Sequence, residues 1–303
     1  MTDSQSILKT NLLDLLHELR DPPMPLLLCG GYGLYLKQVY LQETVSSKTV
    51  IDGELWPAPR ATQDLDILLT VEVVASIHRM QSIKAALDRL GYTAIPRAKY
   101  MQFAKPLGDG RDVKVDILTG SREAYSSDLK VKEKVRLKKG DERRVRPLGN
   151  VRLHARLTNE AVAFEENTME IPVRGTRSNG QSYEGIVHIP QPFTLLLMKL
   201  HAFRDRYASE NKDMGRHHAL DLYRIVAMMT DDEFERTQQR VKQHQDEPAV
   251  IEACRIVAEH FESIESLGAL RLQEHQLWVR NMETDTTMKT FLSAMEDLFQ
   301  LQH

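Results

Sequence analysis

The sequence predicts an α/β (α+β) fold in which a small mixed sheet with flanking helices precedes a C-terminal helical domain. Three observations support this fold class. Short apolar, β-prone runs alternate with helical repeats over residues 1–125, and a β-branched, glycine-punctuated stretch fills residues 126–191. From 192 to 303, apolar residues recur at spacings of three and four, as on one face of a helix. We therefore expect a core at 1–125, a basic, β-rich connector at 126–191 and a helical domain at 192–303.

The first helix is marked by leucines at helical spacing, namely Leu8, Leu12, Leu15, Leu16 and Leu19. The prolines within 22–25 must end this helix, because proline cannot continue it. A short apolar run at 26–29 then predicts a strand that stops at two glycines, and residues 32–41 have helical composition. Residues 44–59 fit a loop or a small hairpin.

The next part of the chain alternates between strand and helix signals. Residues 65–71 are apolar and β-prone. Residues 77–90 show helical spacing, and Gly91 is typical of the position directly after the C-terminus of a helix. Two further strands are expected at 93–95 and 101–104. In the segment 112–118, apolar residues alternate with polar ones, which is typical of a half-buried strand.

A basic run marks the connector. From Lys130 to Arg146 the chain carries nine lysines or arginines and three acidic residues. Such a run either grips a nucleic-acid backbone or is an exposed strand and loop with solvated charges. Beyond it, helices are expected at 194–207, 217–229 and 250–264.

The composition narrows the classes of protein that the chain can belong to. Its formal net charge is −3, so any contact with nucleic acid must come from a local patch rather than from an overall basic field. Cys29 and Cys254 are too few for a disulfide framework or a metal cluster. No apolar run approaches the roughly 20 residues that span a bilayer, and the first residues have no signal-peptide pattern. We expect a cytoplasmic protein with no membrane contact.

Three aspartates carry the predicted chemistry. Asp64 and Asp66 lie two residues apart in a strand-like run, so both side chains leave the same face. Asp116 lies within the alternating strand, on the face opposite to its apolar neighbours, and a place on an adjacent strand would bring it to the other two. Clustered carboxylates repel one another unless a cation or protons neutralise them. Oxygen ligands favour Mg²⁺ or Mn²⁺, and an isolated Asp-x-Asp can equally be a helix cap or a solvated strand end.

Such a cluster suits the transfer of a phosphoryl group. Two divalent cations held roughly 3.5–4 Å apart can activate an attacking hydroxyl and stabilise departing pyrophosphate. Gly30 and Gly31 stand where a strand meets a helix, and their missing side chains allow backbone N–H groups to approach phosphates. Turns also use such a pair of glycines, so the pair alone decides nothing.

Taken in order, these segments resemble the DNA polymerase β-like nucleotidyltransferase superfamily. The resemblance rests on Gly30-Gly31, on Arg60-Ala-Thr-Gln-Asp64-Leu-Asp66-Ile and on Val115-Asp116-Ile. Two later segments, Lys199-Leu-His-Ala-Phe-Arg-Asp-Arg206 and Ala219-Leu-Asp221-Leu-Tyr, are similar to the AbiEii-type toxin branch. The match covers roughly residues 26 to 225 and implies a polymerase β-like fold. The interval before Asp64 is longer than is usual in the superfamily because of residues 42–59.

The resemblance implies roles for individual residues. Asp64, Asp66 and Asp116 would bind metal, and Lys199 and Asp221 would complete the catalytic site. Lys199 interrupts an apolar run, where an unpaired ammonium is costly, so it needs an anionic partner unless it extends to solvent. Asp221 has a second interpretation as a structural ion-pair partner of Lys199 or Arg206.

Three more side chains are candidates for binding the nucleotide. Arg206 follows Lys199 by seven residues and would share its helix face, which would give one cationic wall. Arg60 would contact phosphate, and Thr62 would donate or accept a hydrogen bond unless it only caps the start of the strand. His201, His217 and His218 lack the spacing of a zinc site.

The expected reaction moves a nucleoside monophosphate from a nucleoside triphosphate (NTP) to an acceptor hydroxyl, with Mg²⁺ or Mn²⁺ as cofactor. The resemblance implies a toxin of a toxin–antitoxin or phage-defence pair that acts on the 3′ end of transfer RNA and has a cognate antitoxin protein. A small-molecule nucleotidyltransferase of the antibiotic-modifying kind would use the same chemistry. A catalytically silent protein that binds RNA or a partner is the alternative from another class.

Overall fold

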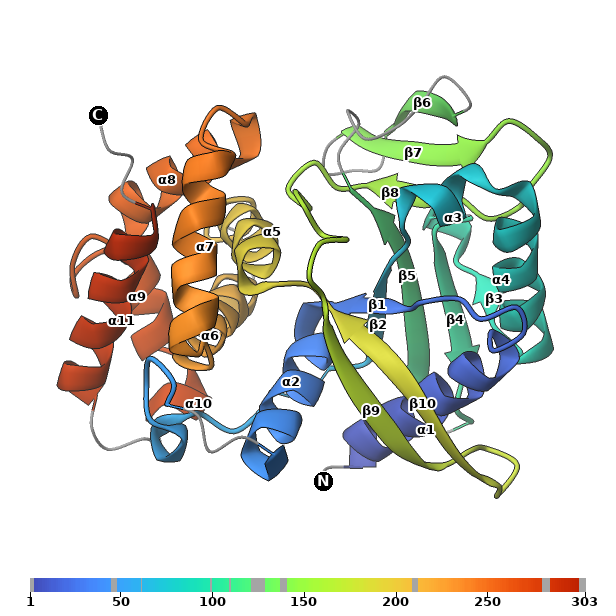
Figure 1. The fold of residues 1–303 in the computed structure, drawn as a ribbon, viewed down its shortest axis with the longest axis horizontal. Helices are drawn as coiled ribbons and strands as arrows, with labels where there is room; N and C mark the ends of the chain where they lie inside the picture. The colour runs from blue at the N-terminus through green and yellow to red at the C-terminus, as the bar shows by residue number, and fades with distance from the viewer. Residues whose placement is uncertain are drawn as a thin grey trace. The chain divides into compact units, whose positions relative to one another are not determined.

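The computed structural model describes residues 3–44, 48–60, 62–98, 100–108, 110–120, 129–136, 141–208, 212–279 and 284–299. The protein has the predicted mixed α/β class, with a helical C-terminal part (Figure 1). The chain divides into two compact units. Unit 1 comprises Met1–Gly33, Ala61–Asn159 and Ala163–Pro190, and unit 2 comprises Leu34–Arg60, Glu160–Val162 and Gln191–His303.

Unit 1 is built on one mixed sheet, with strand order β6-β7-β8-β5-β2-β1-β10-β9 and with β4 joining β3 to β5. Its strands are β1 (Leu27–Cys29), β2 (Asp64–Leu68), β3 (Thr93–Ala94), β4 (Gln102–Pro106), β5 (Asp112–Thr119), β6 (Leu129–Arg136), β7 (Asp141–Pro147), β8 (Ala155–Leu157), β9 (Met169–Thr176) and β10 (Ser182–Ile189). The sheet is larger than the small one predicted, because segment 126–191 adds strands at both ends.

The centre of the sheet is formed by β1, β2 and β5. β2 runs antiparallel to β1 and parallel to β5. Leu65 and Ile67 of β2 and Val115 and Ile117 of β5 are buried, as the alternating pattern predicts. The intervening side chains of these two strands therefore leave the opposite face of the sheet.

Unit 1 also contains helices, one of which packs closely against the sheet. The helix α1 (Asp3–Glu18) packs along the hairpin β9–β10 (Figure 1), and a side chain at Gly175 or Gly185 would meet Leu13 or Leu16 there. The predicted helix at 77–90 is confirmed as α4 (Ile77–Arg89).

The predicted strand at 65–71 is too long at its C-terminal end. It stops at Leu68, because the Thr70 hydroxyl accepts a hydrogen bond from the Val73 N–H and begins the short helix α3 (Val71–Ala75). A polar residue at a helix start therefore overrides the β-prone composition that follows it.

The basic run lies largely in the hairpin β6–β7. The two strands pair antiparallel, with a register irregularity between Lys132 and Val135. The expectation of β structure in the connector is confirmed for the described strands, while residues 137–140 of the run lie outside the described part of the chain. The last strand of this region, β10, pairs parallel with β1 and antiparallel with β9, which is the edge of the sheet.

Unit 2 is helical. Its helices are the part of α2 (Gly30–Thr44) from Leu34 onward, α5 (Pro192–Arg204), α6 (Lys212–Ala227), α7 (Asp231–Gln243), α8 (Pro248–His260), α9 (Leu267–Gln273), α10 (Gln276–Val279) and α11 (Thr284–Phe299). The predicted helices at 194–207, 217–229 and 250–264 correspond to α5, α6 and α8. No helix in the described part of the chain combines the length and apolarity needed to span a bilayer.

Residues 34–60 are held to the helices of unit 2 by backbone and side-chain contacts. The N–H groups of Val50 and Ile51 donate to the carbonyls of Met229 and Ala227. Lys37 Nζ contacts Glu233 Oε1 at 2.7 Å, and both side chains are almost fully buried. Glu233 also completes the capping box of α7 with Thr230. The described residues of the 42–59 segment are thus an integral part of unit 2.

The buried Lys37–Glu233 pair leads to a stability prediction. Lys37→Met removes the ammonium and leaves a buried carboxylate without its counter-ion, which should lower the free energy of unfolding by about 3–5 kcal/mol. Lys242→Met, at an exposed position on the same helix as Glu233, is the control and should change it by less than about 0.5 kcal/mol. Urea unfolding at neutral pH measures both. Equal stabilities of the two variants would contradict the prediction.

Candidate functional site

The structure places Asp64, Asp66 and Asp116 on one face of the unit 1 sheet. Asp66 of β2 and Asp116 of β5 are direct register partners on neighbouring parallel strands. Asp64 lies two residues before Asp66 on β2 and therefore shares its face. Strand period and register together bring the three carboxylates into one region.

Gly30 lies directly against Asp66. The residue has φ +69°, and a Cβ atom built on it would lie 1.8 Å from Asp66 Oδ2. Only glycine allows this close approach of backbone to carboxylate. Gly30 and Gly31 form the start of α2, so the expectation that the glycine pair joins a strand to a helix holds. The positive end of that helix is next to the aspartate face.

Asp116 is held by a neighbouring strand. Gln102 of β4 is its register partner and donates from Nε2 to Asp116 Oδ2 at 2.8 Å. Burial raises the pKa of Asp116, and the nearby Asp64 carboxylate also raises it, while Gln102, Arg156 and Lys114 lower it. The net result is a pKa above the ordinary aspartate value, so this carboxylate holds a proton more readily than an exposed one.

Asp64 has one carboxylate oxygen without a hydrogen-bond partner. Its Oδ1 atom is buried and has no hydrogen-bond partner in the described part of the chain. Lys114 Nζ lies 3.9 Å from that atom, at the limit of an ion pair. The Thr62 hydroxyl accepts from the Asp64 N–H at 3.5 Å, which is the capping role considered for Thr62. The orphaned oxygen leaves a ligand position on Asp64.

A divalent cation fits the chemistry of this face. Three carboxylates on adjacent strand positions are the oxygen donors that Mg²⁺ and Mn²⁺ prefer, and Asp64 Oδ1 lacks a partner among the described residues. Within the described residues, however, no three acidic, histidine or cysteine side chains converge closely enough to hold a metal as they stand. Binding would therefore require side-chain rotation, including movement of Asp116 away from Gln102.

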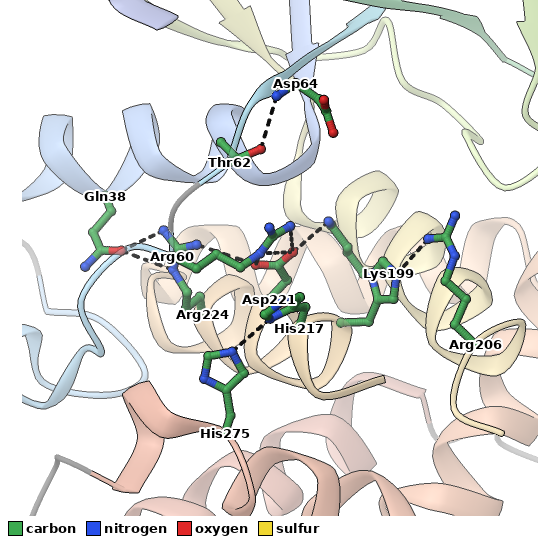
Figure 2. A network of polar contacts seen from close by, with 11 residues as sticks. Gln38, Arg60, Thr62, Asp64, Lys199, Arg206, His217, Asp221, Arg224 and His275 are labelled. Atoms are coloured by element: carbon green, nitrogen blue, oxygen red, sulfur yellow. Dashed lines mark hydrogen bonds and ion pairs between the residues drawn. The ribbon is translucent and has the colours of Figure 1, made fainter. Parts of the chain in front are cut away.

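Unit 2 contains a second polar constellation around Asp221. This carboxylate is fully buried, and Figure 2 shows it between Arg60 and Lys199. Lys199 Nζ lies 2.7 Å from Oδ2, and Arg60 Nη2 lies 3.0 Å from the same oxygen. Arg224 Nη1 approaches Oδ1 at 3.5 Å. Three cationic side chains therefore share one carboxylate, and we call these four residues the Asp221 cluster.

The sequence context explains why these charges pair. Lys199 lies in the apolar helix α5 and is buried, so its ammonium requires an anion, as expected. Burial by itself would raise the pKa of Asp221, but Lys199, Arg60 and Arg224 together lower it well below the ordinary value. Burial lowers the pKa of Arg224 to about 10, which leaves the side chain cationic at neutral pH. The structural ion-pair interpretation of Asp221 therefore describes its contacts.

Polar residues behind the cluster fix its geometry. Gln38 Oε1 accepts from Arg224 Nη2 at 2.8 Å, and Gln38 Nε2 donates to the Pro57 carbonyl, three residues before Arg60. The Leu277 N–H donates to His275 Nδ1, so His275 carries its proton on Nε2 and donates it to His217 Nδ1 at 3.0 Å. Burial lowers the pKa of both histidines, to about 4 for His275, so both rings are neutral at neutral pH.

The expectation that Arg206 shares a helix face with Lys199 is wrong. The helix α5 ends at Arg204, with Asp205 as its C-cap, so helical spacing no longer applies at Arg206. Arg206 Nη1 instead lies 2.8 Å from His218 Nε2. Burial lowers the pKa of His218 to about 2, so its ring is neutral and Nε2 accepts the hydrogen bond.

Several site residues were not predicted from the sequence. Arg224 carried a signal, because it follows Asp221 by one helical turn, whereas Gln38, Gln102 and His275 lie in segments with no motif. No model of a known protein family matches the chain, and a comparison with curated proteins finds no match either.

The contact between Gly30 and Asp66 predicts a stability difference between two glycine positions. Gly91→Ala, at φ +83° with no atom within 4 Å of the new Cβ, should cost only the left-handed backbone strain of about 1–2 kcal/mol. Gly30→Ala carries the same strain and also displaces Asp66, so it should cost clearly more. Urea unfolding of the two variants measures the difference. Equal losses would show that Asp66 moves away without cost.

The Asp221 cluster predicts a pH-dependent stability. Asp221→Asn leaves the buried Lys199 and Arg224 and the partly exposed Arg60 without their shared carboxylate, and should lower the free energy of unfolding by about 3–5 kcal/mol at pH 7. Because the folded pKa of Asp221 lies below the unfolded value of about 3.9, its stabilisation is complete above that value. It is lost as the pH falls through the folded pKa.

The measurement is urea unfolding of wild type and Asp221→Asn at several pH values between 3 and 7. The gap between them should be constant above about pH 5 and narrow below pH 4. The exposed Asp246→Asn is the control and should track wild type throughout. A gap that stays constant down to the lowest pH would contradict the depressed pKa.

Proposed function

We propose that the protein is a metal-dependent nucleotidyltransferase. One observation carries the proposal: Asp66 and Asp116 are register partners on adjacent parallel strands, Asp64 shares their face, and Gly30 at the start of α2 touches Asp66. A carboxylate cluster beside a glycine turn and a helix N-terminus suits a triphosphate with divalent cations. This arrangement also supports membership of the DNA polymerase β-like superfamily and its AbiEii-type branch.

In the proposed reaction an acceptor hydroxyl oxygen attacks the α-phosphorus of the NTP. The new P–O bond forms as the bond to the β-phosphate oxygen breaks, so pyrophosphate leaves and the acceptor keeps the nucleoside monophosphate. The hydroxyl proton passes to Asp116, whose raised pKa suits it to accept a proton. Backbone N–H groups at Gly30 and Gly31 orient the phosphates.

Asp64, Asp66 and Asp116 are the proposed ligands of the Mg²⁺ or Mn²⁺ ions. When bound, these cations neutralise the negative charge that develops on the attacking and leaving oxygens. The orphaned Oδ1 of Asp64 supports this assignment. Thr62 holds the backbone N–H of Asp64 and so positions the first of the three ligands.

The Asp221 cluster in unit 2 suits a polyphosphate. Its three cations exceed the charge of their single carboxylate, and guanidinium and ammonium groups both bind phosphate oxygens well. We propose that Arg60 and Lys199 bind phosphate of the nucleotide and that Asp221 is a positioning residue that aligns them. Arg206, which donates a hydrogen bond to the neutral His218, is a further candidate for binding phosphate.

The motif resemblance extends the proposal to the acceptor. It favours RNA, at the 3′ end of transfer RNA, and a role as toxin with a cognate antitoxin. NTPs and RNA are cytoplasmic substrates, so the proposal also locates the protein in the cytoplasm. A small-molecule acceptor and a silent RNA-binding protein are the alternatives that the next experiment separates.

The test is transfer of label from each α-³²P-labelled NTP to total bacterial RNA in the presence of Mg²⁺. Wild type should label a transfer-RNA band with one preferred NTP. Asp64→Ala should reduce the rate by at least about a thousandfold, because it removes a metal ligand from the reacting centre. Asp88→Asn, at an exposed position on α4, should retain the full rate.

Each result has a distinct meaning. Loss of labelling in Asp64→Ala and not in Asp88→Asn supports the metal site. Label on a small molecule and on no RNA overturns the RNA acceptor but keeps the chemistry. No transfer from any NTP to RNA, protein or small molecules, together with RNA binding, means that the protein is catalytically silent.

A further inference from the structure

A pair of arginines stands opposite each other on the unit 1 sheet. β7 and β8 run antiparallel, and Arg144 of β7 is the direct register partner of Arg156 of β8. Both side chains are partly exposed. Arg144 and Arg156 therefore leave the same face of the sheet and lie side by side.

This face is also the face of the three aspartates. β8 runs parallel to β5, with Arg156 as the partner of Leu118, and Leu118 lies two residues after Asp116 on β5. Arg156 lines a small recess together with Asp116 and Gln102, and its charge lowers the pKa of Asp116. The arginine pair therefore continues directly from the proposed reaction centre.

Two like charges in direct register repel each other, and the Asp116 carboxylate in the same recess as Arg156 offsets part of this repulsion. Like charges placed directly opposite each other on neighbouring strands destabilise the pair. Arg144 Nε is buried and has no hydrogen-bond partner among the residues that the structure describes. Two arginines placed directly opposite each other beside the proposed reaction centre therefore favour a bound anion at this position, because an anion would reduce their repulsion.

A third arginine continues the basic positions along β7. Arg146 follows Arg144 by two residues and therefore lies on the same face of the strand, where its Nη1 atom donates to the Gly149 carbonyl at 2.8 Å. The chain as a whole has a net charge of −3, so this concentration of arginines is local. A row that continues along β7 and onto β8 can meet several phosphates in succession, whereas one triphosphate needs only one cluster of cations.

We infer that Arg144, Arg146 and Arg156, which we call the β7–β8 cation row, bind the phosphodiester backbone of the RNA acceptor and lead it to the aspartate face. The inference rests on the proposed function for the acceptor, but the binding itself requires no catalysis. Guanidinium groups bind phosphate oxygens in a bidentate way, and such contacts position a nucleic acid without reading its sequence.

The test measures RNA affinity in EDTA and without nucleotide, so that no reaction can occur. The probe is a fluorescein-labelled RNA hairpin with a single-stranded 3′ tail, followed by anisotropy over a series of salt concentrations. The double variant Arg144→Gln/Arg156→Gln should bind on the order of tenfold or more weakly at 0.1 M salt. Its slope of log affinity against log salt should become shallower by about 0.7 for each phosphate that the variant no longer neutralises.

Two control variants separate charge from fold. Arg79→Gln/Arg174→Gln removes two exposed positive charges elsewhere on unit 1 and should leave affinity and slope close to wild type. Arg144→Lys/Arg156→Lys keeps the charges and should restore most of the salt slope. Thermal unfolding of each variant shows whether the sheet is intact.

The outcomes distinguish the inference from the proposed function. An unchanged affinity and slope in the glutamine variant, with transfer of label to RNA by wild type, overturns the cation row and leaves the reaction standing. A weakened, less salt-dependent affinity without any transfer supports the row while the reaction fails. Weaker binding of a fluorescent NTP in Mg²⁺, with RNA affinity unchanged, means that the row binds the nucleotide and overturns the inference.

Discussion

The aspartate face of unit 1 depends on the pairing of β2 with β5. In this parallel register Asp66 lies opposite Asp116, and the same register buries Leu65 and Ile67 beside Val115 and Ile117. A slip of one residue would exchange the two faces and place carboxylates in the apolar core. The hydrophobic effect that fixes the core therefore also fixes the position of the three aspartates. Gly30 closes the arrangement directly after β1, because no other residue fits against Asp66.

The polar interior of unit 2 depends on the pairing of the charges in the Asp221 cluster. Buried charges are tolerated only when they are paired, and here one buried carboxylate serves three cations. The neighbouring histidines contribute no charge, because burial keeps them neutral and hydrogen bonds set their tautomers. Excess positive charge is thus held in place by neutral groups such as Gln38. These hydrogen bonds leave the cluster little freedom to rearrange.

Much of the fold was predictable because strand and helix periods are local properties of the sequence. The aspartate pair on β2 and the alternating strand β5 follow from the period of two, and the anionic partner of Lys199 follows from its apolar surroundings. Helix α7 was missed, because its buried positions include Glu233 and Thr237 rather than a stripe of apolar residues. Gln102 and Gln38 were missed because their contacts come from strand pairing and packing across 14 and 186 residues. Arg206 was misplaced because one capping residue ended α5 early.

The division of the chain into units has a consequence for how such a protein can be cut or recombined. Each unit is assembled from three separate stretches of sequence, and residues 34–60 belong with the C-terminal helices although they precede most of the sheet. The backbone bonds from Val50 and Ile51 to Met229 and Ala227, and the buried pair of Lys37 with Glu233, tie these distant stretches together. Removal of the C-terminal helices would therefore leave the Lys37 ammonium and the N–H groups of Val50 and Ile51, which all precede β2, without their partners. The helical unit is not a detachable module, and an exchange between related chains would have to carry both stretches at once.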